Sequence, residues 1–247
     1  MKKNHVIACL LLFFFSCKKS DNHTTTNQVT NGTLTERTET NNSITYRVFF
    51  DNGISAYKGI VVMGSGNDEN NPTPGSLSGA PETEFCEKAA TNGYVSAIVQ
   101  YRKTAGVADW NGSAAVIAAD YNKCIQAISN LYHVDKSKSV VGGFSYASFM
   151  LLTDIAVDNT LSYTQGLLAP CGATGQWDAQ HFMIPVFSIA CSGNNEGDYS
   201  GKELFDQIPG SSSIKGNSAG VTDNSCSTHC GGDWTIPMYN KMVQWLP

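Results

Sequence analysis

The stretch Ser139-Val-Val-Gly-Gly-Phe-Ser-Tyr-Ala-Ser148 decides the fold of this chain. It begins as a short apolar run typical of a buried strand, turns at its glycines, and continues into an apolar segment typical of a helix. Ser145 stands at that turn. A serine in so sharp a turn needs small residues two positions before and after it, because strand and helix approach closely there. Gly143 and Ala147 meet this requirement.

Strand and helix patterns alternate along the chain on both sides of this stretch. Polar and apolar residues alternate at 34–40 and 44–51, which is typical of half-exposed antiparallel strands. Short apolar runs predict buried parallel strands, and apolar residues recurring at three and four predict helices. The expected parallel strands are 59–63, 95–101, 139–142 and 184–190, and the expected helices are 82–92, 114–131 and 237–246. This order predicts an α/β fold.

The segment around Ser145 resembles the nucleophile elbow of α/β-hydrolases, and Val134-Asp135 before the strand is also similar to that family. Ala147 replaces the second glycine of the usual pattern, which the same steric argument permits. The resemblance implies the α/β-hydrolase fold, a mostly parallel central sheet with helices on both faces, and Ser145 as nucleophile. The alternative is a glycine-rich turn between a strand and a helix with an incidental serine.

The family places its general base after the last strand and just before a C-terminal helix. Thr228-His229-Cys230-Gly-Gly232, followed by the predicted helix 237–246, occupies that position. The resemblance therefore implies His229 as the base. The other histidines stand in the N-terminal region or before strands, and are His5, His23, His133 and His181.

The orienting acid of the family follows the strand that 184–190 matches. The next turn reads Cys191-Ser-Gly-Asn-Asn-Glu-Gly-Asp198, and counting along it favours Glu196, whereas residue preference favours Asp198. We expect Glu196. The alternative is that both are solvated loop carboxylates and that Asp178 serves instead.

An acyl-transfer site also needs two N–H donors for the oxyanion. The family resemblance implies the amide of Tyr146, directly after the nucleophile, as one of them. The second is expected in Val62-Met-Gly-Ser-Gly-Asn67, a glycine-rich loop after a strand, with Ser65 or Gly66 as donor. This loop lacks the lysine-containing pattern that cradles phosphates, which argues against nucleotide binding.

Six cysteines follow the N-terminal region, and an even number in an exported domain suggests disulfides. They are Cys86, Cys124, Cys171, Cys191, Cys226 and Cys230. The Ala190-Cys191 end of its strand and the His229-Cys230 pair resemble the cutinase-like and PET-hydrolase-like branch, which is related to dienelactone hydrolases and chlorophyllases. That resemblance implies a Cys191–Cys230 bridge that clamps the acid and base loops together. No second closely spaced cysteine pair completes a zinc site, and we expect no metal.

The N-terminus predicts export. Lys2 and Lys3 precede the apolar run 6–15, which is the pattern of a signal peptide, and Ser16-Cys17 resembles a bacterial lipobox with Cys17 as the lipidated residue. The alternative is an ordinary cleaved signal. We expect a signal peptide at 1–16, the lipidated cysteine and a flexible tether at 17–32, and one hydrolase domain at 33–247.

Composition narrows the possible partners. Of the 247 residues, 41% are hydrophobic and 15% charged, which indicates a packed globular domain, and the net charge is −5. The lack of a basic stripe beyond the first twenty positions argues against nucleic acid as a partner. We expect a monomer without cofactor, held at a membrane only through its lipid and facing the periplasm or the cell exterior.

The substrate is expected to be an ester. Too few residues lie between Cys171 and Ile184 for a large helical lid, so an open site would admit small-molecule, polysaccharide, lipid or polyester esters. Asn67 and Trp177 are the expected cleft residues, and Trp110, Phe144 and Tyr146 are further aromatic candidates. The predicted function is a serine esterase acting through an acyl-enzyme. The alternatives are a peptidase or amidase and a non-catalytic binding lipoprotein on the same fold.

Overall fold

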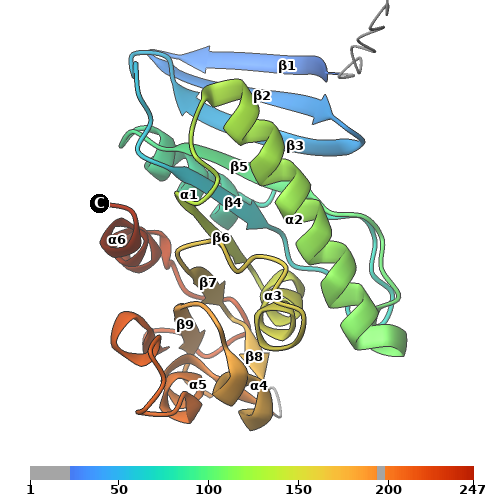
Figure 1. The fold of residues 1–247 in the computed structure, drawn as a ribbon, viewed down its shortest axis with the longest axis vertical. Coiled ribbons are helices and arrows are strands. Elements are labelled where there is room, and N and C mark those ends of the chain that lie inside the picture. Colours follow the sequence, from blue (N-terminus) through green and yellow to red (C-terminus); the bar gives the residue numbers. More distant parts are fainter. Residues whose placement is uncertain (1–22, 194–197) are drawn as a thin grey trace, which may run out of the picture.

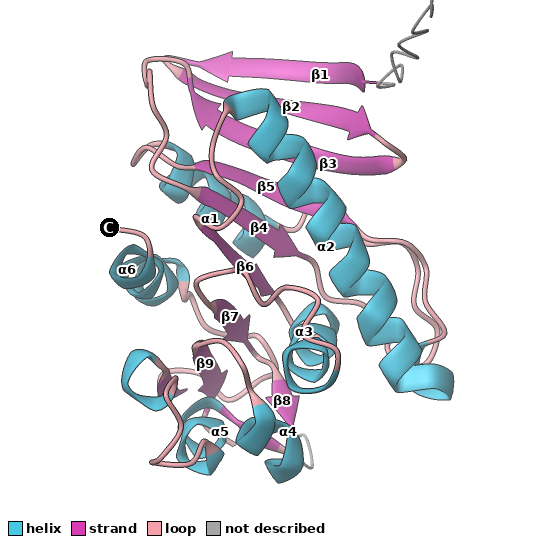
Figure 2. Cartoon of the chain, in the orientation of Figure 1, coloured by secondary structure: helices cyan, strands magenta, loops and turns pink. Residues whose placement is uncertain are grey.

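The structure is a computed structural model, and it describes residues 23–193 and 198–247. The predicted signal peptide, Cys17, the first part of the predicted tether and Glu196 lie outside the described residues. Helices and strands alternate through the rest of the chain (Figures 1 and 2). The strands are β1 (His23–Asn31), β2 (Leu34–Asn41), β3 (Ile44–Asp51), β4 (Ile60–Gly64), β5 (Val95–Gln100), β6 (Ser139–Gly143), β7 (Leu167–Pro170), β8 (Ala173–Thr174), β9 (Val186–Cys191), β10 (Tyr199–Ser200) and β11 (Ala219–Asp223). The helices are α1 (Ala80–Ala90), α2 (Trp110–Tyr132), α3 (Tyr146–Val157), α4 (Gln176–His181), α5 (Gly201–Gln207) and α6 (Thr235–Trp245), with short 3₁₀ turns η1 (Gly106–Asp109) and η2 (Lys215–Asn217).

One large sheet organises the chain, with the strand order β1-β2-β3-β5-β4-β6-β7-β9-β11. The pairs from β1 to β5 are antiparallel, and all pairs from β5 to β11 are parallel. Figure 1 shows α1 and α6 on one side of this sheet and α2 and α3 on the other. The predicted α/β fold, a mostly parallel sheet with helices on both faces, is therefore confirmed.

Both faces of the central strands are buried, which explains their unbroken apolar runs. In β4, Ile60 and Val62 join the hydrophobic core beneath α2 and α3, whereas Val61 and Met63 join the core beneath α1 and α6. Successive side chains of a strand point to opposite faces, so a strand between two helical layers needs apolar residues at every position.

Strand β1 corrects the predicted domain boundary. Residues 23–31 were expected in the flexible tether, but they pair antiparallel with β2 and extend the sheet at its edge. Every side chain of β1 is exposed, so the strand does not need the alternating apolar residues by which a half-buried strand is recognised in a sequence. Backbone pairing joins it to the sheet, with side-chain contacts of His23 to Glu39 at 3.3 Å and of Thr30 to Thr35 at 3.4 Å. Its threonine-rich sequence suits an extended strand. The folded domain thus begins before residue 33.

The segment that links β7 to β9 is short. Between β7 and β9 the chain forms only β8 and the six-residue helix α4, so no lid domain covers this part of the sheet. No helix in the described parts of the chain combines the length and the apolar character that a membrane span needs.

The turn from β6 into α3 is packed as the sequence predicts. A Cβ atom added to Gly143 would lie 2.6 Å from the Cβ of Ala147 and 3.1 Å from its carbonyl carbon. The Tyr121 hydroxyl donates to the Gly142 carbonyl at 2.8 Å, and a Cβ added to Gly143 would lie 3.2 Å from the same hydroxyl. Small residues at 143 and 147 are therefore a steric requirement of this turn.

We expect Gly143→Ala to destabilise the protein by about 1–3 kcal/mol, because overpacking forces strand and helix apart. Adding Ala147→Gly removes the nearer clash, so Gly143→Ala should cost less in the Ala147→Gly variant than in the wild type. Urea unfolding of the wild type, both single variants and the double variant measures this coupling. Strictly additive losses would contradict the packing described.

Candidate active site

Ser145 sits in a backbone conformation that few residues adopt. Its φ is 50° and its ψ is −121°, between the end of β6 and the first residue of α3. A non-glycine residue in this region is strained and persists only where its surroundings fix it. The Ser145 amide donates to the Pro170 carbonyl at 3.3 Å, and the Ser145 carbonyl accepts from the Phe149 amide at 3.0 Å. The turn thus holds the side chain partly exposed at the end of the sheet.

His229 meets Ser145 from the other end of the sequence. Its Nε2 atom lies 2.7 Å from Ser145 Oγ, although the two residues are 84 positions apart. His229 is exposed, in the loop between β11 and α6. Its ring centroid is also 6.3 Å from that of Phe149, one helical turn beyond Ser145. The sequence-predicted nucleophile and base are therefore brought within hydrogen-bond distance.

Asp223 and Trp234 join the two ends of the loop that carries His229, a role that no sequence pattern indicated. Trp234 Nε1 donates to Asp223 Oδ2 at 2.9 Å, and the amide and hydroxyl of Ser225 donate to Oδ1 at 2.8 and 2.6 Å. The hydrogen bonds from Ser225, together with that from Trp234, lower the pKa of Asp223. The carboxylate that ends β11 thus joins the two ends of the loop that carries His229.

Two disulfides hold the same loop, and they correct the predicted pairing. Cys230 is bonded to Cys171 and Cys191 to Cys226, with Cα–Cα distances of 5.2 and 5.1 Å, so the predicted Cys191–Cys230 bridge is wrong. Cys191 ends β9, and its register partner on β11 is Asp223. Cys226 follows Asp223 by three residues, so it comes close to Cys191. Cys230 lies further along the loop and reaches Cys171, directly after β7. The order of neighbouring strands in the sheet decides which cysteines form disulfides, and that order cannot be read from the sequence. The other two cysteines of the domain, Cys86 and Cys124, are buried and form no disulfide.

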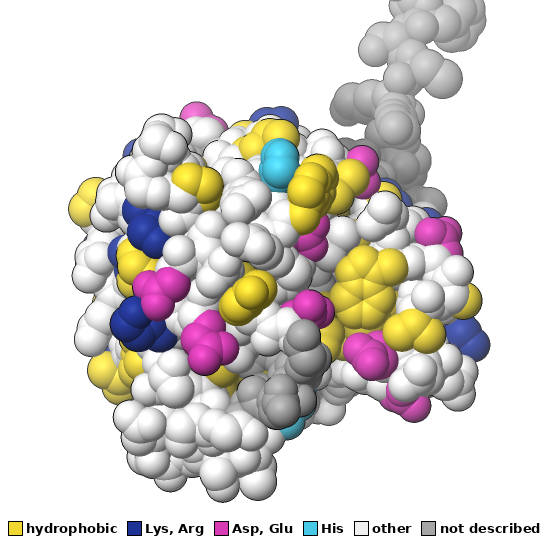
Figure 3. Space-filling model, turned by 90° about the horizontal axis from the view of Figure 1, so that it is seen from below, with side chains coloured by type: hydrophobic (Ala, Val, Ile, Leu, Met, Phe, Trp, Pro, Cys, Tyr) yellow, Lys and Arg dark blue, Asp and Glu magenta, His cyan; other side chains and the backbone are white. Residues whose placement is uncertain are grey.

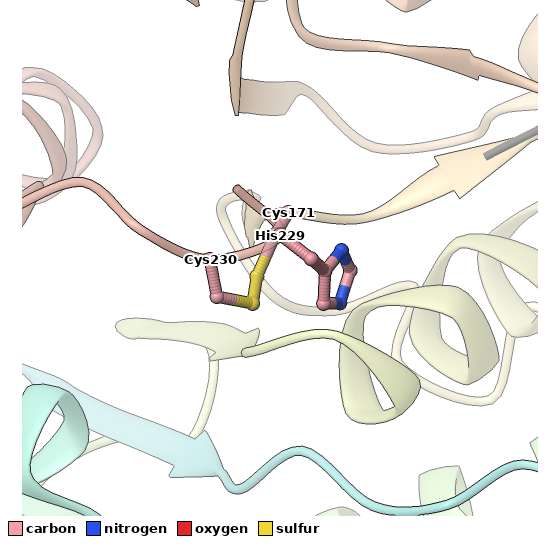
Figure 4. A group of neighbouring side chains, drawn as sticks. All are labelled: Cys171, His229 and Cys230. Carbon is pink, nitrogen blue, oxygen red and sulfur yellow. A yellow bond between two sulfur atoms is a disulfide. The ribbon is translucent and has the colours of Figure 1, made fainter. Parts of the chain in front are cut away.

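Figure 4 shows the Cys171–Cys230 bridge directly beside the His229 imidazole. The two sulfur atoms and a ring nitrogen of His229 lie within 4.8 Å of one another. Because the sulfur atoms are bonded to each other, they offer no thiolate to a metal ion. Both cysteines have a positive φ, 45° for Cys171 and 54° for Cys230. The bridge therefore joins two tight turns, one at the end of β7 and one beside the base.

Two of the three predicted oxyanion donors, Tyr146 and Gly66, lie next to Ser145. Tyr146 begins α3, so its amide is at the helix N-terminus, where N–H groups and the helix dipole favour negative charge. Gly66 lies against the nucleophile, because a Cβ added to it would be 3.2 Å from Ser145 Cβ. Ser65 is buried, and its hydroxyl accepts from the Ser76 amide at 2.7 Å. Gly66 is thus the better placed of the two loop candidates.

The three candidates for the orienting acid, Glu196, Asp198 and Asp178, have different surroundings or lie outside the described residues. Glu196 lies outside the described residues, and Asp198 is exposed. Asp178, on α4, accepts a hydrogen bond from the Thr174 hydroxyl, and burial, with the nearby Asp198 charge, raises its pKa. Glu196 therefore stays a prediction.

A cleft of about 450 Å³ adjoins the Ser145–His229 pair through Phe149, which contacts both residues. It is lined by Glu69, Val107, Trp110, Phe149, Ala173 and Asp198. Of the aromatic candidates, Trp110 is in this lining, whereas Phe144 and Tyr146 are not.

The two predicted cleft residues lie elsewhere. Asn67 organises its own loop, with Oδ1 accepting from the Thr73 amide at 3.1 Å and Nδ2 donating to the Thr73 carbonyl at 2.7 Å. Trp177 is 56% exposed and stacks on His181 with ring centroids 4.0 Å apart. Neither residue is part of the cleft lining.

Comparison with known proteins defines the fold. No protein-family model and no curated protein sequence matches the chain. Among solved structures, a glucuronoyl esterase from Solibacter usitatus is 10% identical with a TM-score of 0.63, over 92% of this chain and 87% of that one. A lid-less α/β serine hydrolase from Xanthomonas campestris is 13% identical with a TM-score of 0.56, over 90% and 99%. A dienelactone hydrolase-like promiscuous phosphotriesterase from metagenomic libraries is 13% identical with a TM-score of 0.53, over 91% and 98%. The chain has the α/β-hydrolase fold.

The two disulfides are expected to contribute similarly to stability but differently to catalysis. They close segments of 59 and 35 residues, for which chain entropy gives about 4 kcal/mol each. Only the Cys171–Cys230 bridge adjoins His229. Cys171→Ser/Cys230→Ser should therefore lower kcat for ester hydrolysis by roughly tenfold or more, since a small misplacement of a catalytic group is costly. Cys191→Ser/Cys226→Ser is the matched control.

Melting curves and esterase kinetics of both double variants, assayed at a temperature where each is folded, give the comparison. Equal kcat values in the two variants would show that the Cys171–Cys230 bridge has no special part in positioning His229.

Proposed function

We propose that this protein is a serine hydrolase that cleaves carboxylic esters through an acyl-enzyme on Ser145, with His229 as general base. The observation that carries the proposal is the 2.7 Å contact between His229 Nε2 and Ser145 Oγ, made at a strained strand-to-helix turn. A nucleophile and a base within hydrogen-bond reach form the arrangement that activates a hydroxyl group. The similarity in fold to esterases and other hydrolases supports the same conclusion.

The reaction follows from this geometry. Ser145 Oγ attacks the ester carbonyl carbon while its proton passes to His229 Nε2, giving a tetrahedral intermediate. The intermediate collapses, the bond to the alcohol oxygen breaks, and the imidazolium returns its proton to the leaving alcohol. Water then repeats the sequence on the acyl-enzyme, with His229 taking a proton from the water molecule. The acid is released and Ser145 is restored.

The oxyanion of both intermediates is assigned to the amides of Tyr146 and Gly66. Tyr146 offers the first N–H of α3, and Gly66 brings main chain against Ser145 without a side chain in the way. Donors fixed before the reaction cost no reorganisation as charge develops. The absence of a lid domain over the described sheet leaves room for a bulky ester.

The orienting acid is proposed to be Glu196, with Asp198 as the alternative from the same loop. Either would follow β9, the strand that neighbours β11 and therefore the origin of the His229 loop. A carboxylate there would fix the imidazole tautomer and stabilise the imidazolium formed in each half-reaction.

The protein is proposed to act outside the cytoplasm as a lipoprotein anchored through Cys17. Two disulfides in the described domain support this location, because such bonds persist in oxidising compartments. A signal-type N-terminus supports it independently. In this proposal the enzyme is a monomer that needs no cofactor and acts on an extracytoplasmic ester.

Labelling with a fluorophosphonate probe tests the nucleophile. We expect wild-type protein to react at Ser145 and to hydrolyse 4-nitrophenyl acetate. Ser145→Ala should lose both properties while keeping its melting temperature. Ser162→Ala, which changes an exposed serine before β7, is the control and should behave as wild type. Folded wild-type protein that neither reacts nor turns over would favour a binding protein, and faster turnover of a matched anilide than of the ester would favour an amidase.

Two isosteric variants assign the acid. We expect Glu196→Gln to lower kcat by about 10³–10⁴-fold, because an amide favours the wrong imidazole tautomer. Asp198→Asn should change it less than tenfold. The reverse pattern would assign the role to Asp198. If both variants kept nearly full activity, neither carboxylate would be the acid, and Asp178→Asn would be measured next.

A further inference from the structure

The cleft beside the nucleophile has an aromatic wall that is fixed in place. Trp110 lies over Phe149 with ring centroids 6.3 Å apart and an interplanar angle of 29°. Its edge contact with Tyr146 has a centroid distance of 6.4 Å. Trp110 Nε1 donates to the Thr153 hydroxyl at 2.9 Å. Since this N–H group is already satisfied, Trp110 offers the cleft mainly ring surface, which binds flat or ring-shaped groups.

The charges of the cleft have one sign. Glu69 and Asp198 are the ionisable residues of its lining, and among the described residues no lysine, arginine or histidine belongs to that lining. In Figure 3, which views the molecule from below, the large yellow hydrophobic patch on the right has magenta acidic side chains around it, and most dark blue basic side chains are on the left. Carboxylates accept strong hydrogen bonds from hydroxyl groups and repel anions.

The position of Glu69 is fixed by the backbone. Its carbonyl accepts from the Val107 amide at 3.0 Å, which ties the loop after β4 to η1. Gly106 has a φ of 63°, and a side chain there would collide with the same carbonyl and with Pro72. Glu69 and Val107 therefore come to the cleft together, in the same lining as Phe149 of α3.

The cleft adjoins the reacting groups. Phe149 is hydrogen-bonded through its amide to the Ser145 carbonyl, and its ring centroid is 6.3 Å from that of His229. A substrate whose ester carbonyl is at Ser145 would thus place an adjoining group against Phe149 and Trp110. Binding energy from such a non-reacting group can serve the chemical step.

We propose that this cleft binds an uncharged, hydroxylated ring of the ester substrate and discriminates against anionic esters. The ring face packs on Trp110 and Phe149, and its hydroxyl groups donate to Glu69 and Asp198. A sugar in the alcohol part and a phenol in the acyl part share this chemistry. The inference rests on the proposed esterase function and adds a substrate class to it.

A panel of esters followed by acid release in a pH-stat tests the proposal. The phenolic arm compares methyl 4-hydroxycinnamate with methyl 4-carboxycinnamate, and the sugar arm compares an acetylated methyl xyloside with an acetylated methyl glucuronide. Methyl hexanoate is the ester without a ring. We expect kcat/KM for the neutral member to exceed that for the anionic member by roughly tenfold or more in one arm, which identifies the source of the ring.

Two variants test the aromatic surface and the negative charge of the cleft separately. Trp110→Ala should lower kcat/KM for the neutral ring ester by roughly tenfold, and that for methyl hexanoate by less than threefold. Glu69→Gln should raise the ratio of kcat/KM for the anionic member to that for the neutral member, because it removes a negative charge from the cleft. Trp177→Ala is the matched control, because this exposed tryptophan is outside the cleft lining, and it should behave as wild type.

Equal turnover of neutral and anionic members in both arms would overturn the proposal. A loss in Trp110→Ala that is the same for ring and acyclic esters, or a loss of equal size in Trp177→Ala, would also overturn it.

Binding of methyl xyloside and 4-hydroxycinnamide to Ser145→Ala protein, measured by saturation-transfer NMR, separates the cleft assignment from the esterase proposal. Binding that Trp110→Ala abolishes, in a protein that cleaves no ester, would uphold the cleft assignment while the esterase proposal fails. Binding that is absent, or unchanged by Trp110→Ala, would refute the cleft assignment.

Discussion

The close approach of Gly143 to Ala147, with Ser145 held at a φ of 50° between them, is the contact on which the site depends. A turn this tight directs the serine side chain away from both strand and helix, and it leaves the first N–H of α3 beside the reacting atom. The cost of the strained backbone is offset by two well-packed cores, one on each face of the sheet. A larger residue at either small position would move strand and helix apart and displace the nucleophile.

Everything else in the site is brought to this turn from a distance. His229 belongs to a loop that has little regular structure, and three links hold it: the Asp223–Trp234 hydrogen bond, the Cys191–Cys226 bridge and the Cys171–Cys230 bridge. These links tie the loop to the ends of β7, β9 and β11, which are adjacent strands of the same sheet. An exposed base on a surface loop can therefore keep a defined position without a buried setting of its own.

The sequence predicts what local sterics and chain order determine, and less of what depends on tertiary neighbours. The turn at Ser145 was readable because only small residues fit at 143 and 147, and His229 because of its order before a final helix. Strand β1 was missed because it pairs with β2 mainly through the backbone and buries no apolar side chain. The disulfide pairing was predicted wrongly because it follows from the strand order β7-β9-β11. The cleft was missed in part because Glu69, Val107 and Phe149 meet only in the folded chain.

The most direct test of the central claim is the mass of the protein during turnover. Wild-type enzyme mixed with 4-nitrophenyl butanoate and quenched in acid within milliseconds should carry one butanoyl group. Peptide mapping should place that group on Ser145, and the signal should decay as substrate is exhausted. Ester turnover with no acylated protein at any quench time, or an acyl group carried by another residue, would contradict the account of Ser145 as the nucleophile that this fold positions.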